Sequence, residues 1–212
     1  AIYLTTSAKS AGADAALLVT PYYNKPTQEG LYLHYQLIAD EVDLPQILYN
    51  VPSRTGCDLL NETVLRLVDH QNIVGLKDAT GDLARLEDFM TNLDSQQKDN
   101  FALYSGDDPT ATEFMINGGT GTISVTSNIV PKTISNICDY ALSGEAKAAR
   151  ELDTTLVRLN QILFIESNPI PVKWMLNRIG RITDGIRLPL SHLDTKFHDE
   201  AEEVLTELNL LN

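Results

Sequence analysis

Short, almost wholly apolar runs alternate with stretches of helical periodicity through the first 125 residues of the chain. Polar and apolar residues do not alternate within these runs, so both faces of each run would be buried. Strands of this kind belong to parallel sheets, in which a crossover helix follows each strand. The pattern therefore predicts an α/β fold with parallel strands at residues 15–20, 46–50, 73–77, 101–105 and 121–125.

Apolar residues recur at helical spacing between these runs, and a short helix is predicted at 63–70. After residue 125 the chain shows helical periodicity only. Two architectures remain open, a doubly wound sheet and a (β/α)8 barrel. The absence of a GxGxxG motif and of a P-loop weakens a nucleotide-binding doubly wound sheet. The predicted buried helical faces comprise Leu31, Tyr35, Ile38 and Val42; Leu83, Leu86, Met90 and Leu93; Ile134, Ile137 and Ala141; Leu152, Leu156, Leu159 and Leu163; Val172, Met175, Leu176 and Ile179; and Ala201, Val204, Leu205 and Leu208.

The charge balance of the chain argues against a nucleic-acid partner. It has 212 residues, with 29 Asp and Glu against 16 Lys and Arg, and a formal net charge of −13. Such a chain repels a phosphate backbone, and no local basic patch is visible in the sequence. No apolar run reaches the ~18 residues of a membrane helix. Cys57 and Cys138 cannot form a disulfide framework, which favours a reducing compartment such as the cytoplasm.

Polar residues end the predicted strands, where both architectures place their functional groups. Lys77 ends the apolar run IVGLK. A lysine buried there would have a lowered pKa and could attack a ketone to form a Schiff base. A solvated strand-end lysine, or one paired with Asp78, is the structural alternative. Tyr49 occupies the equivalent point one unit earlier, where its phenol could transfer protons or could simply pack.

The loops after the strands carry further candidates. Arg54 lies in a Pro-Ser-Arg-Thr-Gly segment and could bind a carboxylate or be a surface arginine in a turn. Tyr22 and Tyr23 are consecutive aromatics in a loop, which favours recognition or an interface over the core. Asp107 and Asp108 precede a proline and an apolar helix, so they are interpreted as helix-capping residues rather than a metal pair.

Two further features carry weaker predictions. The run GGTG at 118–121 could hold an anion through its backbone N–H groups. The four histidines have no metal-ligand spacing, and no catalytic Ser-His-Asp or Cys-His pattern is visible.

Six stretches together resemble the dihydrodipicolinate synthase family of pyruvate-dependent, class I aldolase-type lyases, and the resemblance runs from Ala1 to Asn212. It implies the C-terminal portion of a (β/α)8 TIM barrel at residues 1–143, with a C-terminal helical extension at 144–212. It also implies that the five strands are the fourth to eighth of the barrel, so that about three βα units precede Ala1. The stretches are LLVTPYYNKPTQEGLY, ILYNVPSRTG, IVGLKDATGDLARL, YSGDD, GGTGTISVTSN and ESNPIPVKW.

The resemblance also implies roles for individual residues. Lys77 resembles the lysine that forms a Schiff base with pyruvate, and Tyr49 resembles the proton-transfer tyrosine. Tyr23 resembles the tyrosine that crosses a dimer interface to complete a proton relay. Arg54 resembles the residue that holds the carboxylate of L-aspartate 4-semialdehyde. The remaining matches are Ile123, whose backbone would lie beside pyruvate, and Tyr22, which would line a possible lysine-feedback pocket.

These matches imply a synthase of lysine and diaminopimelate biosynthesis that needs no metal or organic cofactor and forms a homotetramer of tight dimers. Two threonines of the family's site would lie upstream of Ala1. Three alternatives remain open: a sister lyase acting on sialic acid or 2-keto-3-deoxy sugar acids, a phosphate- or flavin-binding barrel that uses the glycine run, and a non-catalytic binding protein. Arg54 favours the synthase over the sister lyases.

Overall fold

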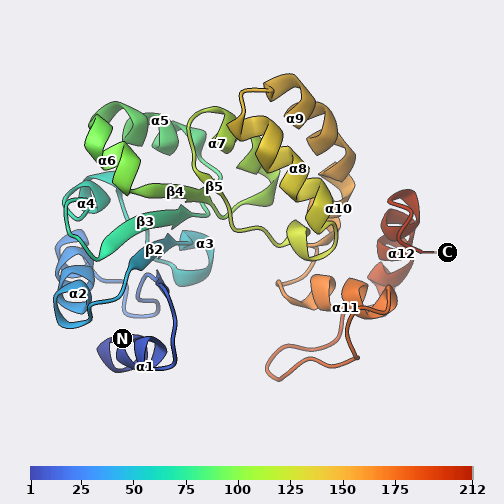
Figure 1. Ribbon diagram of the computed structural model, residues 1–212. Helices are drawn as coiled ribbons and strands as arrows, with labels where there is room; N and C mark the ends of the chain where they lie inside the picture. Colours follow the sequence, from blue (N-terminus) through green and yellow to red (C-terminus); the bar gives the residue numbers. More distant parts are fainter. Residues whose placement is uncertain (212) are drawn as a thin grey trace. The chain divides into compact units, whose positions relative to one another are not determined.

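The computed structural model describes residues 1–211, which form two compact units, Ala1–Ile123 and Ser124–Asn212. The first unit contains one parallel sheet whose strands follow one another in chain order (Figure 1). A doubly wound sheet reverses its strand order at a switch point, whereas a barrel adds each strand beside the previous one. The strands are β1 (Ala16–Val19), β2 (Gln46–Asn50), β3 (Ile73–Asp78), β4 (Ala102–Ser105) and β5 (Gly121–Thr122).

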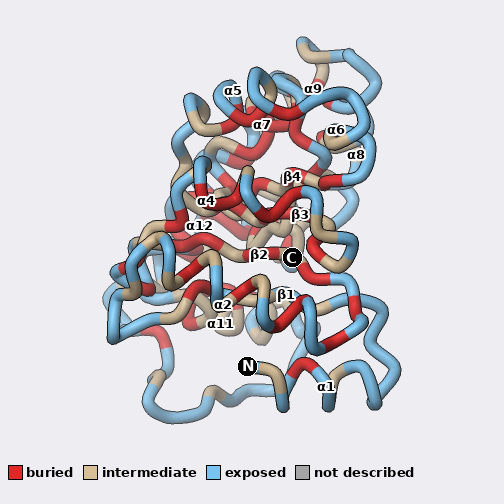
Figure 2. Tube along the Cα trace, turned by 90° about the vertical axis from the view of Figure 1, so that its left-hand side faces the viewer, coloured by how far each residue is buried: buried red, intermediate tan, exposed pale blue. Residues whose placement is uncertain are grey.

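Helices cover one face of this sheet and bury its apolar side chains. Leu48, Leu76 and Leu103 point into a core shared with these helices. Figure 2 colours the buried residues of the strands and helices red. On the other face, Leu17 and Val19 of β1 are 45% and 40% exposed. The helices of the unit are α1 (Ile2–Ser10), α2 (Gln28–Glu41), α3 (Pro52–Thr55), α4 (Asn61–Leu65), α5 (Leu83–Asn92), α6 (Ser95–Asn100), the 3-10 turn η1 (Asp108–Thr110) and α7 (Ala111–Ile116).

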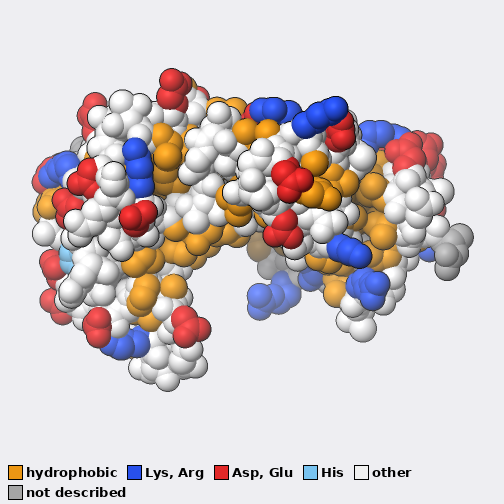
Figure 3. Space-filling view, turned by 45° about the horizontal axis from the view of Figure 1, so that its top comes forward, with side chains coloured by type: hydrophobic (Ala, Val, Ile, Leu, Met, Phe, Trp, Pro, Cys, Tyr) orange, Lys and Arg blue, Asp and Glu red, His pale blue; other side chains and the backbone are white. Residues whose placement is uncertain are grey.

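The regular secondary structure of the described residues of the second unit is all helical, as the sequence predicts. Its helices are η2 (Thr126–Asn128), α8 (Pro131–Leu142), α9 (Ala146–Asp153), η3 (Thr154–Leu156), α10 (Val157–Ile162), α11 (Ile170–Arg178), η4 (Thr195–Phe197) and α12 (His198–Glu207). None of the helices within residues 1–211 is both long and apolar enough to span a lipid bilayer. On the face drawn in Figure 3, acidic and basic side chains are interspersed and form no continuous basic surface.

Three predicted elements differ from the observed ones by more than one residue at an end. The strand at 121–125 stops at Thr122, because Ser127 donates its N–H to the Ser124 hydroxyl and its hydroxyl to the Ser124 carbonyl, which turns the chain. The helix through 152–163 is interrupted at η3, where Thr154 and Thr155 donate their hydroxyls to carbonyls three residues earlier. The helix at 63–70 is the shorter and earlier α4.

Candidate functional site

The register of the parallel sheet aligns three side chains that carry the candidate chemistry. Tyr49 on β2 pairs with Lys77 on β3, and Lys77 pairs with Tyr104 on β4. Directly paired residues of neighbouring parallel strands point to the same face of a sheet. The three side chains therefore form one row at the carboxyl ends of adjacent strands, on the face that the helices leave uncovered.

Lys77 and Tyr49 are in contact within this row. The Lys77 Nζ lies 4.3 Å from the centroid of the Tyr49 ring. Burial lowers the pKa of Lys77; the negative charge of Asp108 opposes this shift and the positive charge of Arg54 adds to it. Burial raises the pKa of the Tyr49 phenol, against the opposing effect of Arg54. Burial therefore disfavours the charged form of both groups, the ammonium of Lys77 and the phenolate of Tyr49.

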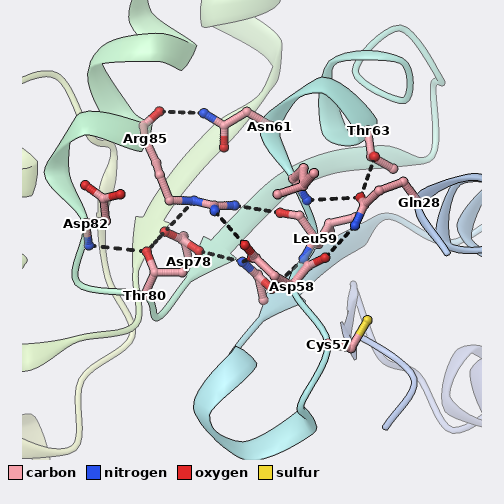
Figure 4. Close-up of polar contacts among 12 residues, drawn as sticks. Gln28, Cys57, Asp58, Leu59, Asn61, Thr63, Asp78, Thr80, Asp82 and Arg85 are labelled. Carbon is pink, nitrogen blue, oxygen red and sulfur yellow. Dashed lines mark hydrogen bonds and ion pairs between the residues drawn. The ribbon is translucent and has the colours of Figure 1, made fainter. Parts of the chain in front are cut away.

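The pairing of Lys77 with Asp78, considered as an alternative in the sequence, is not formed. Asp78 is buried on the opposite face of β3, as strand alternation requires. There it accepts hydrogen bonds from Asn50 at 3.1 Å and from the Thr80 hydroxyl at 2.6 Å, and it forms an ion pair with Arg85 at 3.7 Å (Figure 4). Because Asp78 is occupied there, it does not hold Lys77 as an ammonium.

Arg54 lies on α3, a one-turn helix in the segment that the sequence analysis treats as a loop. Pro52 starts this helix, and Gly56 ends it in the left-handed conformation, with φ of 67°. The Arg54 side chain is exposed, yet its charge affects the pKa of both Tyr49 and Lys77. An exposed cation therefore acts electrostatically on both members of the lysine–tyrosine pair.

Tyr22 and Tyr23 lie in the loop after β1, at the surface. Their side chains are 68% and 93% exposed, and Tyr23 adopts a positive φ of 68°. A ring as exposed as that of Tyr23 has little contact with its own chain, so the structure does not bring it against Lys77. Ile123 follows β5 and donates its N–H to the Ser105 carbonyl at 2.9 Å, which places its backbone at the same sheet edge.

The predicted helix capping by Asp107 and Asp108 is confirmed in the position of Asp107 but not in a side-chain capping bond. Asp107 stands at the N-cap position of η1 without a side-chain capping bond; its carboxylate instead accepts from the Thr110 hydroxyl at 2.7 Å. Asp108 is buried, and its charge acts on Lys77.

The glycine run at 118–121 is no anion cradle. The N–H groups of Gly118, Gly119 and Thr120 all donate to backbone carbonyls of the same unit. No cluster of three potential metal ligands occurs among residues 1–211.

The sequence analysis missed several residues around the site. Tyr104 has the same strand position as Tyr49 and Lys77, and that equivalence could have identified it. Gly106 packs against Lys77 so closely that an added Cβ would lie 2.7 Å from the Lys77 Cε. Arg85, on α5, has no distinguishing sequence signal, because its partners are brought to it only by the fold.

Several known proteins similar to this chain belong to one family. A sequence model of the dihydrodipicolinate synthetase family matches residues 1–208. The 4-hydroxy-tetrahydrodipicolinate synthase of Pseudomonas syringae pv. syringae (strain B728a) is 54% identical over 211 residues, which cover 100% of this chain and 71% of that protein.

Solved structures agree with this match. The chloride-inhibited dihydrodipicolinate synthase from Acinetobacter baumannii, crystallised with pyruvate, is 51% identical with a TM-score of 0.94, over 99% of this chain and 71% of that one. The first monomeric dihydrodipicolinate synthase variant is 41% identical with a TM-score of 0.94, over 99% of this chain and 70% of that one. The similarity confirms the expected (β/α)8 barrel architecture with a C-terminal helical extension.

Proposed function

Because the chain belongs to the dihydrodipicolinate synthetase family, we propose that it condenses pyruvate with L-aspartate 4-semialdehyde to give 4-hydroxy-tetrahydrodipicolinate. The reaction is that of a class I, Schiff-base lyase in lysine and diaminopimelate biosynthesis. The observation that carries this proposal is the contact between the Lys77 amine and the Tyr49 ring at the carboxyl ends of neighbouring strands.

Lys77 supplies the nucleophile. Its amine attacks the pyruvate ketone, and the ketone oxygen leaves as water to give a protonated imine. The lowered pKa of Lys77 supports this step, because only the neutral amine has a free electron pair. The imine then loses a proton from the pyruvate methyl carbon, and its cationic nitrogen accepts the electron pair that remains. The product of this step is an enamine.

Tyr49 moves the protons of these steps. The raised pKa of its phenol keeps the hydroxyl protonated at neutral pH, so it can donate a proton to the departing oxygen. The positive charge of Arg54 favours the phenolate that forms for the duration of the transfer. Tyr49 is thereby suited to give a proton in one step and accept one in the next.

The enamine carbon attacks the aldehyde carbon of the semialdehyde, whose oxygen takes up a proton to become a hydroxyl. The amino group of the same substrate then attacks the imine carbon and displaces Lys77, which closes the ring and frees the lysine. Arg54 would hold the carboxylate of this second substrate, since its guanidinium offers a fork of donors on the exposed side of the pair.

The remaining assignments rest on the resemblance and on surface position. The 93% exposure of Tyr23 is what a residue that completes a partner's site would have, and it supports a homotetramer of tight dimers. Ile123 would lie beside pyruvate, and Tyr22 would line a lysine-binding pocket. The free thiols of Cys57 and Cys138 support a cytoplasmic location.

Two experiments on the full-length protein test the proposal. Borohydride reduction in the presence of pyruvate should add the mass of reduced pyruvate to the peptide that contains Lys77; an unmodified peptide would overturn the Schiff-base mechanism. Arg54→Ala should leave this adduct intact and lower kcat/KM for the semialdehyde at least tenfold. Unchanged turnover of the semialdehyde would refute the assignment of the second substrate.

A further inference from the structure

Behind the row of Tyr49, Lys77 and Tyr104, on the helix-covered face of the sheet, lies a connected polar cluster (Figure 4). Asn50 follows Tyr49 in β2, and Asp78 follows Lys77 in β3, and both side chains are buried. Asn50 Nδ2 donates to Asp78 Oδ1 at 3.1 Å and to Asp58 Oδ1 at 2.8 Å. The cluster therefore joins the two strands of the reaction site to a loop.

That loop is the end of the segment that carries Arg54. The chain leaves the sheet after Asn50, forms α3, and returns at Leu59, whose N–H donates to the Asn50 Oδ1 at 3.0 Å. The side-chain amide of Asn50 thus holds together the two ends of this segment, residues 51–58, called the excursion below. The excursion itself has only one turn of helix, which is too short to be stable without such support.

Arg85, on α5, contacts the same point, where the excursion returns to the sheet. Its Nη1 donates to Asp58 Oδ2 at 3.1 Å, its Nη2 donates to the Leu59 carbonyl at 2.6 Å, and its Nε lies 3.7 Å from Asp78 Oδ2. The Arg85 side chain is only 15% exposed. The planar guanidinium thus donates to two acceptors and keeps its charge beside a third group, Asp78, whereas a lysine ammonium would reach fewer of them in this arrangement.

We propose that Arg85 is a positioning residue, which holds the Arg54-bearing excursion at 51–58 against the strand that carries Lys77. The proposal rests on the proposed function, because it assigns Arg85 to the binding of the second substrate through Arg54. β2 and β3 are already held together by their own backbone ladder. Loss of Arg85 should therefore disturb the excursion far more than the contact between Lys77 and Tyr49.

A double-mutant cycle tests this coupling. Arg85→Met should lower kcat/KM for the semialdehyde at least tenfold, mainly through KM, while trapping of pyruvate on Lys77 by borohydride stays within twofold. In an Arg54→Ala background, Arg85→Met should lower kcat/KM for the semialdehyde less than twofold, because the group that Arg85 positions is already absent. Arg85→Lys should recover part of the loss. The proposal would be overturned if the losses in kcat/KM of the two single mutants multiplied in the double mutant. It would also be overturned if Arg85→Met lowered pyruvate trapping as much as it lowered kcat/KM.

A matched control and a second variant separate positioning from folding. Arg66→Met removes an arginine that also donates to a carboxylate, Glu29, but lies outside the cluster; it should leave both half-reactions unchanged. Asp58→Ala removes a partner whose side chain is 39% exposed, so it should fold and reproduce the KM effect of Arg85→Met. An Asp58→Ala protein with parental KM would contradict the proposal.

Amide hydrogen exchange tests the inference independently of the reaction. Arg85→Met should speed exchange at the Leu59 N–H and through 51–58, and should leave the core amides of β3 protected. Unchanged exchange in this segment would refute the positioning role even if the parent enzyme is active. Failure of the parent to trap pyruvate would instead refute the proposed function, and the exchange result would still decide the role of Arg85.

Discussion

The amine of Lys77 lies 4.3 Å from the centroid of the Tyr49 ring, at paired positions on two parallel strands. The pairing is a direct result of register: the same strand position on neighbouring βα units gives side chains on one face. The proposed nucleophile and the proposed proton carrier are thus held by the backbone ladder of the sheet. Arg54 and Tyr23 lie on excursions and loops, where substrate-specific groups can vary without disturbing that pair.

The lowered pKa of Lys77 predicts the pH dependence of adduct formation. Protonation removes the nucleophilic electron pair, so the rate should fall about tenfold for each unit of pH below the pKa of Lys77. Burial lowers that pKa. The rate of adduct formation should therefore stay at its high-pH plateau down to a pH below about 10.4, the pKa of a free lysine. Single-turnover trapping of pyruvate across a pH series measures this profile.

Lys77→Arg is the control for that profile. Its guanidinium stays protonated across the series, so no adduct should form at any pH. A parental profile that turned near pH 10.4 would contradict a lysine shifted by burial.

Tyr49→Phe should separate imine formation from proton transfer. The phenylalanine keeps the ring that packs against Lys77, so pyruvate should still be trapped, although more slowly, because the phenol no longer protonates the departing oxygen. Loss of the hydroxyl should slow exchange of the pyruvate methyl hydrogens with deuterated water by roughly 10²- to 10⁴-fold. Proton NMR of pyruvate measures this exchange. The control is Tyr140→Phe, at a tyrosine on α8, which should exchange the methyl hydrogens of pyruvate at the parental rate. Exchange at the parental rate in Tyr49→Phe would contradict the role of the phenol.

Leu76→Ala should destabilise the sheet beside Lys77. Leu76 is 1% exposed, and removal of a buried leucine side chain costs about 2–5 kcal/mol through lost transfer energy and an unfilled cavity. Leu188, at 88% exposure, provides the matched control, and Leu188→Ala should change the stability by at most about 0.5 kcal/mol. Denaturant unfolding followed by circular dichroism compares the two. Equal stability of the two variants would show that Leu76 does not support the core as its burial indicates.

Much of the strand layout could be predicted from the sequence, because continuous apolar runs are typical of strands in a parallel sheet; the burial of both faces, also expected, is not found in β1, where Leu17 and Val19 are exposed. The run at 46–50 matches β2 in full, and β3 extends one residue further, to Asp78. The contact of Lys77 with Tyr49 followed from their shared position at strand ends. The short helices were harder: α3 was interpreted as a turn, and α6 was missed although Asp94 and Gln97 form a capping box.

The cluster behind the site could not be predicted in the same way. Arg85, Asp58 and Asn50 are separated by many residues, and their types are ordinary for a helix face, a loop and a strand end. Only tertiary packing brings them together. Likewise, the capping interpretation of Asp108 followed local sequence rules, whereas its burial and its effect on Lys77 depend on the neighbouring strand. Local patterns therefore located the reacting groups, and the groups that support them required the fold.

Gly106 is predicted to be essential for the position of Lys77. A Cβ added there would lie 2.7 Å from the Lys77 Cε, 3.1 Å from its Cγ and 2.9 Å from the Ala79 Cβ, all closer than unstrained contacts allow. Gly106→Ala should push the lysine side chain out of its contact with Tyr49. Misplacement of a reacting group by about 1 Å can cost on the order of 10²-fold in rate, so pyruvate trapping should fall by about that factor. Gly121→Ala is the matched control: Gly121 is the first residue of β5, and an added Cβ would meet the Tyr104 ring at an ordinary 3.5 Å. It should trap pyruvate at close to the parental rate. Equal trapping by the two variants, with both folded by circular dichroism, would show that the lysine can move aside without loss and that Gly106 has no positioning role.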